Sequence, residues 1–252
     1  MNTNEALYTY TLRLADDALI MGHRLAEWCS KAPFLEEDLA LTNFSLDLIG
    51  RAQALLSYAA QIENKGRTYD DLAYKRGERE FYNHLITELP NGNFAFTMAK
   101  LFLFSTYEIH VYEVLVKSHD ETIAAIAAKT LKEIKYHQKH ASNWILRLGD
   151  GTKESHSKMQ DALNQIWMFT GNLFEMDNVD HEMLKKNIGV NFTEIKTQWL
   201  QTISKTINEA TLTMPNDEYM QTGSKQGIHT ENLGYILAEM QYLQRAYPNA
   251  KW

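Results

Sequence analysis

The sequence contains a single cysteine, Cys29, which has no second cysteine with which to form an internal disulfide. Residues that interrupt helices are also few, with four prolines and twelve glycines among 252 residues. The most apolar segments, such as residues 98–107 (MAKLFLFSTY), are much shorter than the roughly 20 residues that a helix needs to cross a bilayer. These absences argue against a disulfide-stabilised scaffold and against a membrane-spanning protein.

Positive charge is also scarce, because 25 lysines and arginines stand against 32 acidic residues, which gives a net charge of −7. An acidic protein without a long basic run repels a phosphate backbone, so we predict no nucleic-acid partner. Near the N-terminus, Arg13, Asp16 and Asp17 occupy positions where a signal peptide would need its apolar stretch. We therefore expect a cytoplasmic protein with no membrane partner.

Helix-forming residues dominate the segments between the prolines and glycines. They predict four long helices and several shorter ones, and four helices of this length favour a bundle. No linker or low-complexity tract divides the chain, so we predict an all-α bundle with additional C-terminal helices, organised as a single domain over residues 1–252. The predicted long helices are 5–30, 36–64, 93–118 and 121–148, and the shorter ones lie within 69–88, at 154–174, after the capping-box pattern of 191–194 (NFTE) and after Thr230.

Residues 132–140 (KEIKYHQKH) raise the question of a metal site, because bundles hold two iron ions with glutamates and histidines. Such a site takes one glutamate from each of two helices and a Glu-x-x-His pair from each of the other two. None of the nine histidines has an acid three residues before it. A looser four-residue step occurs at Glu80/His84, Glu133/His137 and Asp177/His181, and only Glu133/His137 lies in a predicted long helix.

The acids of the predicted long helices suggest a site that has lost its metal. Glu133 and His137 lie on a stripe from Ile126 to Trp144, which either points inward or is solvated, since lysines flank it. Glu108 lies on an apolar stripe of the third helix. Asp47 lies on a stripe from Ala40 to Ser57 in which Gly50 replaces the expected histidine. We predict no metal and no catalytic residue here, with vestigial candidates Asp47, Glu108, Glu133 and His137.

Two points stay open on the sequence alone. The first helix offers either Asp16 or Asp17 as its acid, and the rival interpretation is an ordinary helical domain with satisfied polar core residues. If the core acids are buried without metal, they need partners. The expected partners are Arg51, Arg24, His137 and Tyr136.

Six segments resemble the C subunits of bacterial phenylacetyl-CoA epoxidases, also called ring 1,2-phenylacetyl-CoA monooxygenases. The resemblance covers essentially the whole chain and includes a C-terminal Gly-x-His-Thr-Glu block at residues 227–231. The segments are 12–33, 38–60, 89–99 (LPNGNFAFTMA), 132–152, 207–215 (INEATLTMP) and 223–248.

This resemblance implies a ferritin-like bundle that acts as the structural, non-catalytic subunit of a monooxygenase complex in aerobic phenylacetate catabolism. It implies a di-iron cofactor in the partner A subunit, which inserts one oxygen atom of O2 into the aromatic ring, and no cofactor in this chain. The implied partners are that A subunit and the other epoxidase subunits including the reductase, with self-association when the chain is alone. The alternative is a free-standing di-iron oxygenase or ferroxidase that uses Asp47, Glu108, Glu133 and His137.

Two surface features bear on partners. Apolar residues of 39–49 point in nearly every direction around the second helix, more than one core stripe requires, which predicts a subunit interface with Leu41 or Phe44 among its outward-facing members. Lys225 and Lys251 could contact phosphates of a CoA thioester, although lysines in loops are more often solvated.

Overall fold

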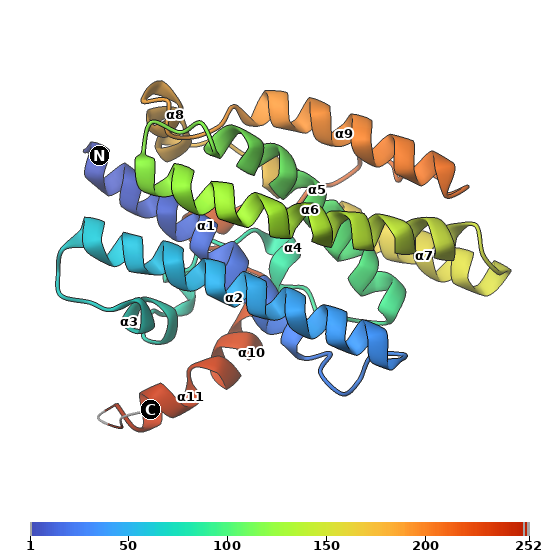
Figure 1. Ribbon diagram of the computed structural model, residues 1–252, viewed down its shortest axis with the longest axis horizontal. Helices are drawn as coiled ribbons and strands as arrows, with labels where there is room; N and C mark the ends of the chain where they lie inside the picture. Colours follow the sequence, from blue (N-terminus) through green and yellow to red (C-terminus); the bar gives the residue numbers. More distant parts are fainter. Residues whose placement is uncertain (1, 249, 251–252) are drawn as a thin grey trace. The chain divides into compact units, whose positions relative to one another are not determined.

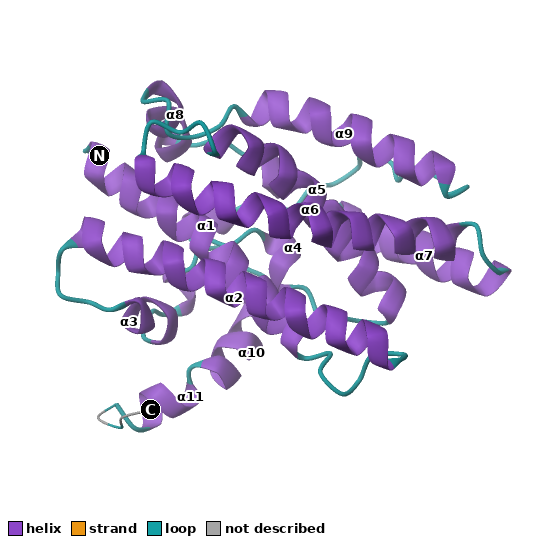
Figure 2. Ribbon diagram, in the orientation of Figure 1, coloured by secondary structure: helices purple, strands orange, loops and turns teal. Residues whose placement is uncertain are grey.

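The computed structural model describes residues 2–248 and residue 250, and the regular elements among these residues are helices (Figures 1 and 2). The all-α prediction is therefore confirmed. The chain forms two compact units, one made of residues 1–90, 177–183 and 223–252 and the other of residues 91–176 and 184–222. No helix of the described residues is long and apolar enough to cross a membrane. The single domain over 1–252 stays a prediction.

Unit 1 is built on the long helices α1 (Thr3–Ala26) and α2 (Leu35–Glu63), which pack side by side (Figure 1). Asn2 caps α1, because its side chain accepts a hydrogen bond from the backbone N–H of Glu5 and the Glu5 carboxylate accepts one from Asn2. The close contact of the two helices depends on Gly22 of α1. Its carbonyl accepts a 2.8 Å hydrogen bond from the Ser45 hydroxyl of α2, and an added Cβ would lie 3.0 Å from Ile49 Cγ1.

Short helices complete unit 1, and their bounds are α3 (Tyr69–Tyr74), η1 (Glu78–Glu80), α4 (Leu85–Glu88), η3 (Ser224–Gln226), α10 (Glu231–Met240) and α11 (Tyr242–Ala246), together with residues 178–183 of α8 (Asn178–Lys185). Thr230 caps α10, as the sequence predicts. The sequence makes no prediction for α8, because its eight residues span too few turns for a reliable apolar period.

Unit 2 is built around α5 (Phe94–Leu115), which packs against α6 (Glu121–Gly149), α7 (Lys153–Trp167) and α9 (Phe192–Glu209). Helix α5 is apolar on every side because neighbours surround it, and the indole N–H of Trp199 in α9 donates to the Leu103 carbonyl at 2.8 Å. The predicted helix 154–174 stops at Trp167 and is followed by η2 (Gly171–Phe174). Asn191 caps α9 by accepting from the N–H of Thr193, but the full capping box does not form, because the Glu194 carboxylate accepts from the Asn191 side-chain amide instead of its backbone N–H.

Two glycines at different helix positions give a test of this packing. A Cβ on Gly149, at the end of α6, would lie 2.5 Å from the Ala210 carbonyl oxygen, whereas a Cβ on Gly50 of α2 would meet nothing within 4 Å. We expect Gly149→Ala to lower the free energy of unfolding by about 1–3 kcal/mol through overpacking. Gly50→Ala should raise it by up to about 1 kcal/mol, because alanine restricts the unfolded chain and favours helix. Urea unfolding followed by circular dichroism measures both, and equal effects from the two variants would contradict this packing.

Candidate functional site

The four predicted vestigial residues lie on three helices. Asp47 belongs to α2 in unit 1 and is half-buried. In unit 2, Glu108 of α5 is 4 % exposed and His137 of α6 is 2 % exposed, whereas Glu133 is half-buried. That these four residues derive from one former metal site stays a prediction.

The predicted stripe of α6 only partly coincides with the buried face of that helix. Thr130 and His137 are buried, but Glu133 and His140 lie at the edge of the buried face. Tyr136, a predicted partner for a core acid, is 60 % exposed. The buried face steps by three or four residues through Ile123, Ala127, Thr130, Ile134, His137, Ala141, Ile145 and Gly149.

The predicted inner stripe of α2 needs a correction. Asn43, Gly50 and Ala54 are exposed, so this stripe follows the surface of the helix. The predicted stripe follows a face of small and polar residues. The neighbouring, more apolar face of the helix is the one that packs into the core. The buried members of that face include Leu41, Phe44, Leu48, Leu55 and Leu56.

Both acids of the middle of α1 are buried and engaged with side chains of the segment between α3 and α4. Asp16 forms a buried ion pair with Arg76 and accepts the backbone N–H of Tyr82 at 3.0 Å. Asp17 accepts the backbone N–H of His84 and contacts the His84 Nδ1, each at 2.7 Å. The sequence left Asp16 and Asp17 as alternatives, and the structure gives each its own partner.

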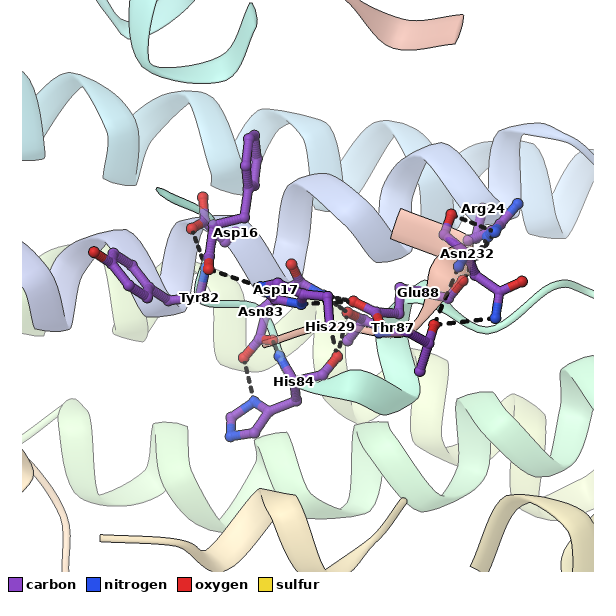
Figure 3. Close-up of polar contacts among 12 residues, drawn as sticks. Asp16, Asp17, Arg24, Tyr82, Asn83, His84, Thr87, Glu88, His229 and Asn232 are labelled. Atoms are coloured by element: carbon purple, nitrogen blue, oxygen red, sulfur yellow. Dashed lines mark hydrogen bonds and ion pairs between the residues drawn. The ribbon is translucent and has the colours of Figure 1, made fainter. Parts of the chain in front are cut away.

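Glu88 is the centre of a second set of contacts, which Figure 3 shows together with those of Asp16 and Asp17. Its Oε2 accepts from the Asn83 side-chain amide at 2.9 Å and lies 2.9 Å from Nδ1 of His229. Its Oε1 accepts the backbone N–H of Thr230 at 2.6 Å. The side chains of Glu88 and His229 are fully buried. The C-terminal signature block is thereby bound to α4 (Figure 3).

The geometry fixes the protonation of this pair. Nδ1 of His229 faces the Glu88 carboxylate, and Nε2 faces the Phe81 carbonyl oxygen at 2.8 Å. The carbonyl oxygen can only accept, so Nε2 carries a proton, and an ionised Glu88 carboxylate accepts a hydrogen bond from a second proton on Nδ1. Burial acts to lower the pKa of His229, but the hydrogen bond and charge of Glu88 outweigh it and raise that pKa. The contact with Glu88 therefore favours the imidazolium form of His229.

Two further contacts fix the same segment. Arg24 of α1 donates to the Glu88 carbonyl oxygen from Nε at 3.0 Å and from Nη2 at 2.9 Å. Gly227 adopts a left-handed backbone with φ of +70°, and a Cβ there would lie 2.2 Å from the Arg79 carbonyl oxygen. Only glycine meets both requirements, which explains its place at the start of the block.

A second buried ionic cluster also joins distant parts of unit 1. The Arg13 guanidinium of α1 forms ion pairs with the carboxylates of Asp177 and Asp180, and the Lys225 ammonium lies 2.6 Å from Asp180 Oδ2. Burial lowers the pKa of Lys225, partly offset by Asp180. Lys225 is 7 % exposed, so the suggested phosphate contact is corrected to a buried ion pair. Lys251 lies outside the described residues.

These two clusters are suited to holding segments together. Every acid in them has at least one cationic partner or several N–H donors, so these contacts hold each carboxylate in a fixed position. In the part of the chain that the structure describes, no three or more His, Cys, Asp or Glu side chains are gathered as a metal site. Sequence reasoning identified the His-Thr-Glu block but missed Glu88, Arg76 and Asp180, which lie far from it along the chain.

Comparison with known proteins gives two matches. The family described as phenylacetic acid catabolic protein matches residues 1–252. The chain is 46 % identical over 246 residues to a protein of Escherichia coli (strain K12) that is named as the C subunit of 1,2-phenylacetyl-CoA epoxidase, and the alignment covers 98 % of this chain and 99 % of that relative. The resemblance drawn from the sequence segments is confirmed, and the all-α architecture is consistent with a ferritin-like fold.

The His229–Glu88 pair predicts a specific dependence of stability on pH. The pKa of His229 is raised in the folded state, and the charges that face the ring are those of Glu88 and Asp16. The pair therefore stabilises the fold fully below the unfolded histidine pKa of about 6.5, and its contribution is lost as pH rises through the folded pKa. We expect His229→Gln to cost about 3 kcal/mol or more near pH 6, where the variant leaves the Glu88 carboxylate buried without its cation, and progressively less as pH rises.

Urea unfolding of the wild-type chain and of His229→Gln at several pH values measures the difference between their free energies of unfolding. Groups that titrate in the same way in the two proteins cancel from this difference. His181→Gln is the matched control, because His181 is exposed and contacts a backbone oxygen, that of Asp177. A His229→Gln effect that is constant between pH 6 and pH 9 would contradict the charged pair.

Proposed function

Because the chain belongs to the phenylacetic acid catabolic protein family, we propose that it is a non-catalytic structural subunit of a 1,2-phenylacetyl-CoA epoxidase. In this proposal it pairs with a homologous A subunit that carries the di-iron site, and it acts with the other epoxidase subunits including the reductase. The relative from Escherichia coli bears the name of the C subunit of such an epoxidase. The chemistry of ring epoxidation would take place on the A subunit.

The observation that carries this proposal is the engagement of the α1 carboxylates. A di-iron bundle needs a carboxylate from each of two helices and a Glu-x-x-His pair from each of the others. Asp16 is bound to Arg76 and Asp17 to His84, both within a buried set of contacts. Freeing Asp16 for a metal would leave the Arg76 guanidinium buried without a counter-charge, which costs several kcal/mol, and freeing Asp17 would break its two hydrogen-bond contacts with His84. The spacing of acids and histidines in the sequence supports the same conclusion.

The remaining polar core residues fit a bundle that has diverged from a metal-binding ancestor. Glu108 and His137 are buried on the adjacent helices α5 and α6 of unit 2, where an active relative would keep ligands. Glu133 and Asp47 are only half-buried. In our proposal these four residues now serve folding rather than catalysis.

Helix α2 offers a surface for the A subunit. Three large apolar side chains of α2 reach solvent: Leu35, Leu39 and Leu46 are 69 %, 56 % and 63 % exposed. The side chain of the N-cap residue, Phe34, is 46 % exposed. They follow one face of the helix, which continues through the small residues Gly50 and Ala54. A permanent partner buries on the order of 2,000 Å² or more, largely through such residues. We name Phe34, Leu35, Leu39, Leu46, Gly50 and Ala54 the α2 stripe.

The proposal predicts that Glu133 and His137 take no part in catalysis. With each replaced by Ala, activity per assembled epoxidase complex should stay near wild type, because neither residue contacts iron or oxygen. Iron bound to the purified chain after iron-supplemented expression should be far below one ion per chain. A loss of about a thousandfold with assembly intact, on the order of 4 kcal/mol in the barrier, would instead support the free-standing di-iron oxygenase or ferroxidase.

The α2 stripe predicts which substitutions abolish pairing. Leu41 and Phe44, which the sequence pattern places facing outward, are 0 % and 1 % exposed, so that prediction is wrong and they would test the core instead. Leu39→Glu combined with Leu46→Glu should prevent co-purification with the A subunit and leave the helical circular dichroism unchanged. Val114→Glu on α5, which is 42 % exposed, is the matched control. A mixed complex that survives the double substitution at micromolar concentration would place the interface elsewhere.

A further inference from the structure

The outward face of α6 in unit 2 carries a row of positive charge. Its exposed side chains recur at steps of three and four residues, on the side of the helix opposite the buried face. At a rise of about 1.5 Å per residue the row is roughly 27 Å long. We name it the basic stripe, and its members are Lys129, Lys132, Tyr136, Lys139, Asn143 and Arg147.

Acidic residues are almost absent from this part of the helix. Between residues 122 and 149, α6 has five cations and one acid, Glu133, which lies at the edge of the buried face. An ordinary solvated face pairs its charges, as α7 does with Lys158 and Glu154 one turn apart. Among the residues that the structure describes, none forms an ion pair with a lysine of the basic stripe. The stripe is therefore a face of unneutralised charge.

The basic stripe also holds an aromatic side chain at its centre. Tyr136 is 60 % exposed and lies between Lys132 and Lys139 on the same face. At the C-terminal end of the stripe, the Arg147 guanidinium lies over the Trp144 ring at 5.4 Å, which restricts its position. Tyrosine and arginine are enriched at protein interfaces. These features indicate a contact surface for another protein.

The distribution of charge along the chain shows what kind of partner this surface fits. Unit 2 contains thirteen lysines and arginines and thirteen acids, whereas unit 1 contains twelve and nineteen, so unit 1 accounts for the whole net charge of −7. A long polyanion is repelled by an acidic protein as a whole. The stripe also lacks the large apolar side chains with which a helix enters a membrane surface. A protein with a local acidic patch fits the stripe better than a nucleic acid or an anionic membrane.

The composition of the stripe also indicates how long the partner stays. A permanent partner buries on the order of 2,000 Å² or more through largely apolar residues. The basic stripe offers four cations and one exposed ring, which favour fast association and a contact that weakens with salt. Such a contact suits a protein that arrives and leaves in every turnover. Among the partners in the proposed function, the reductase has that task, whereas the A subunit stays bound.

We propose that the basic stripe docks an acidic patch of the epoxidase reductase, which binds and leaves in each catalytic cycle. The four cations meet carboxylates of the reductase, and the ring of Tyr136 packs at the centre of the contact. This inference rests on the proposed function and adds a second surface, on a different helix from the α2 stripe. It gives a non-catalytic subunit a part in positioning the electron donor.

Two triple variants with the same change of charge provide the test. The stripe variant combines Lys129→Glu, Lys132→Glu and Lys139→Glu. The control variant changes exposed lysines of α7 and α9, and it combines Lys153→Glu, Lys158→Glu and Lys205→Glu. Circular dichroism and co-purification with the A subunit check that both variants fold and assemble.

The first experiment measures the activity of the assembled epoxidase complex while the reductase concentration is varied. The stripe variant should raise the KM for the reductase at least about tenfold at low salt, because it places like charges in the contact. Its kcat at saturating reductase should stay near wild type, since the stripe takes no part in the chemistry. Equal KM values for the stripe and control variants would overturn the proposal.

Ionic strength separates the charges of the stripe from its ring. In the wild-type complex, kcat/KM for the reductase should fall steeply between about 0.05 and about 0.3 M salt, and the stripe variant should lose most of this dependence. Tyr136→Ala should raise the KM a few-fold and leave the salt dependence unchanged, because the ring carries no charge. A wild-type kcat/KM that is independent of salt would contradict the docking.

Crosslinking tests the contact directly. A carbodiimide condenses a lysine amine with a carboxylate, so it should join lysines of the basic stripe to acidic residues of the reductase and leave the control lysines free. Mass spectrometry of the digested complex identifies these pairs. Crosslinks from the stripe to the A subunit alone, or loss of co-purification with the A subunit in the stripe variant, would assign the stripe to that subunit and overturn the proposal.

The outcomes distinguish this inference from the proposed function. An active wild-type complex in which the stripe variant has no effect refutes the reductase docking alone. A wild-type chain that fails to pair with the A subunit refutes the proposed function, and the docking with it. Binding of the chain to duplex DNA, or to vesicles of phosphatidylcholine and anionic phosphatidylglycerol, at about 0.15 M salt would reassign the stripe to a polyanion if the stripe variant abolishes it.

Discussion

The buried pair of Glu88 and His229 is the contact on which the organisation of unit 1 depends. It joins α4 to the C-terminal signature block across about 140 residues of sequence, with both side chains fully removed from solvent. Because neither charge can be left alone without a large penalty, the pair makes docking of the C-terminal segment close to all-or-none. The N–H of Thr230 and the amide of Asn83 complete the shell of the carboxylate.

The arrangement also explains how polar residues can fill the core of unit 1. A carboxylate that is surrounded by hydrogen-bond donors and cations is held in one place by these contacts. Asp16, Asp17, Glu88 and Asp180 all receive such partners from segments distant in sequence. Within unit 1, buried charge therefore specifies which segments meet, in the manner attributed to polar core residues that enforce register.

The sequence predicted the elements better than the contacts. Long helices and the caps Asn191 and Thr230 could be found because both depend on local residue preferences. The engagement of Asp16 and Asp17 could not be found, because it depends on Arg76 and His84, which come close only through the tertiary fold. The predicted inner stripe from Ala40 to Ser57 was assigned to the wrong side of α2 for a related reason: this helix is apolar over much of its circumference, so periodicity alone does not choose the packed face.

Unit 1 is discontinuous along the chain, since it needs residues 1–90, the short segment 177–183 and the residues from 223 onward. Synthesis on the ribosome delivers these parts far apart in time, and the continuous N-terminal part emerges first. Until His229 and Lys225 leave the exit tunnel, Glu88 and Asp180 have no cationic partner from the C-terminal segment. The ionic core that the N-terminal helices contribute to unit 1 is therefore completed only after residues 225 and 229 have also left the ribosome.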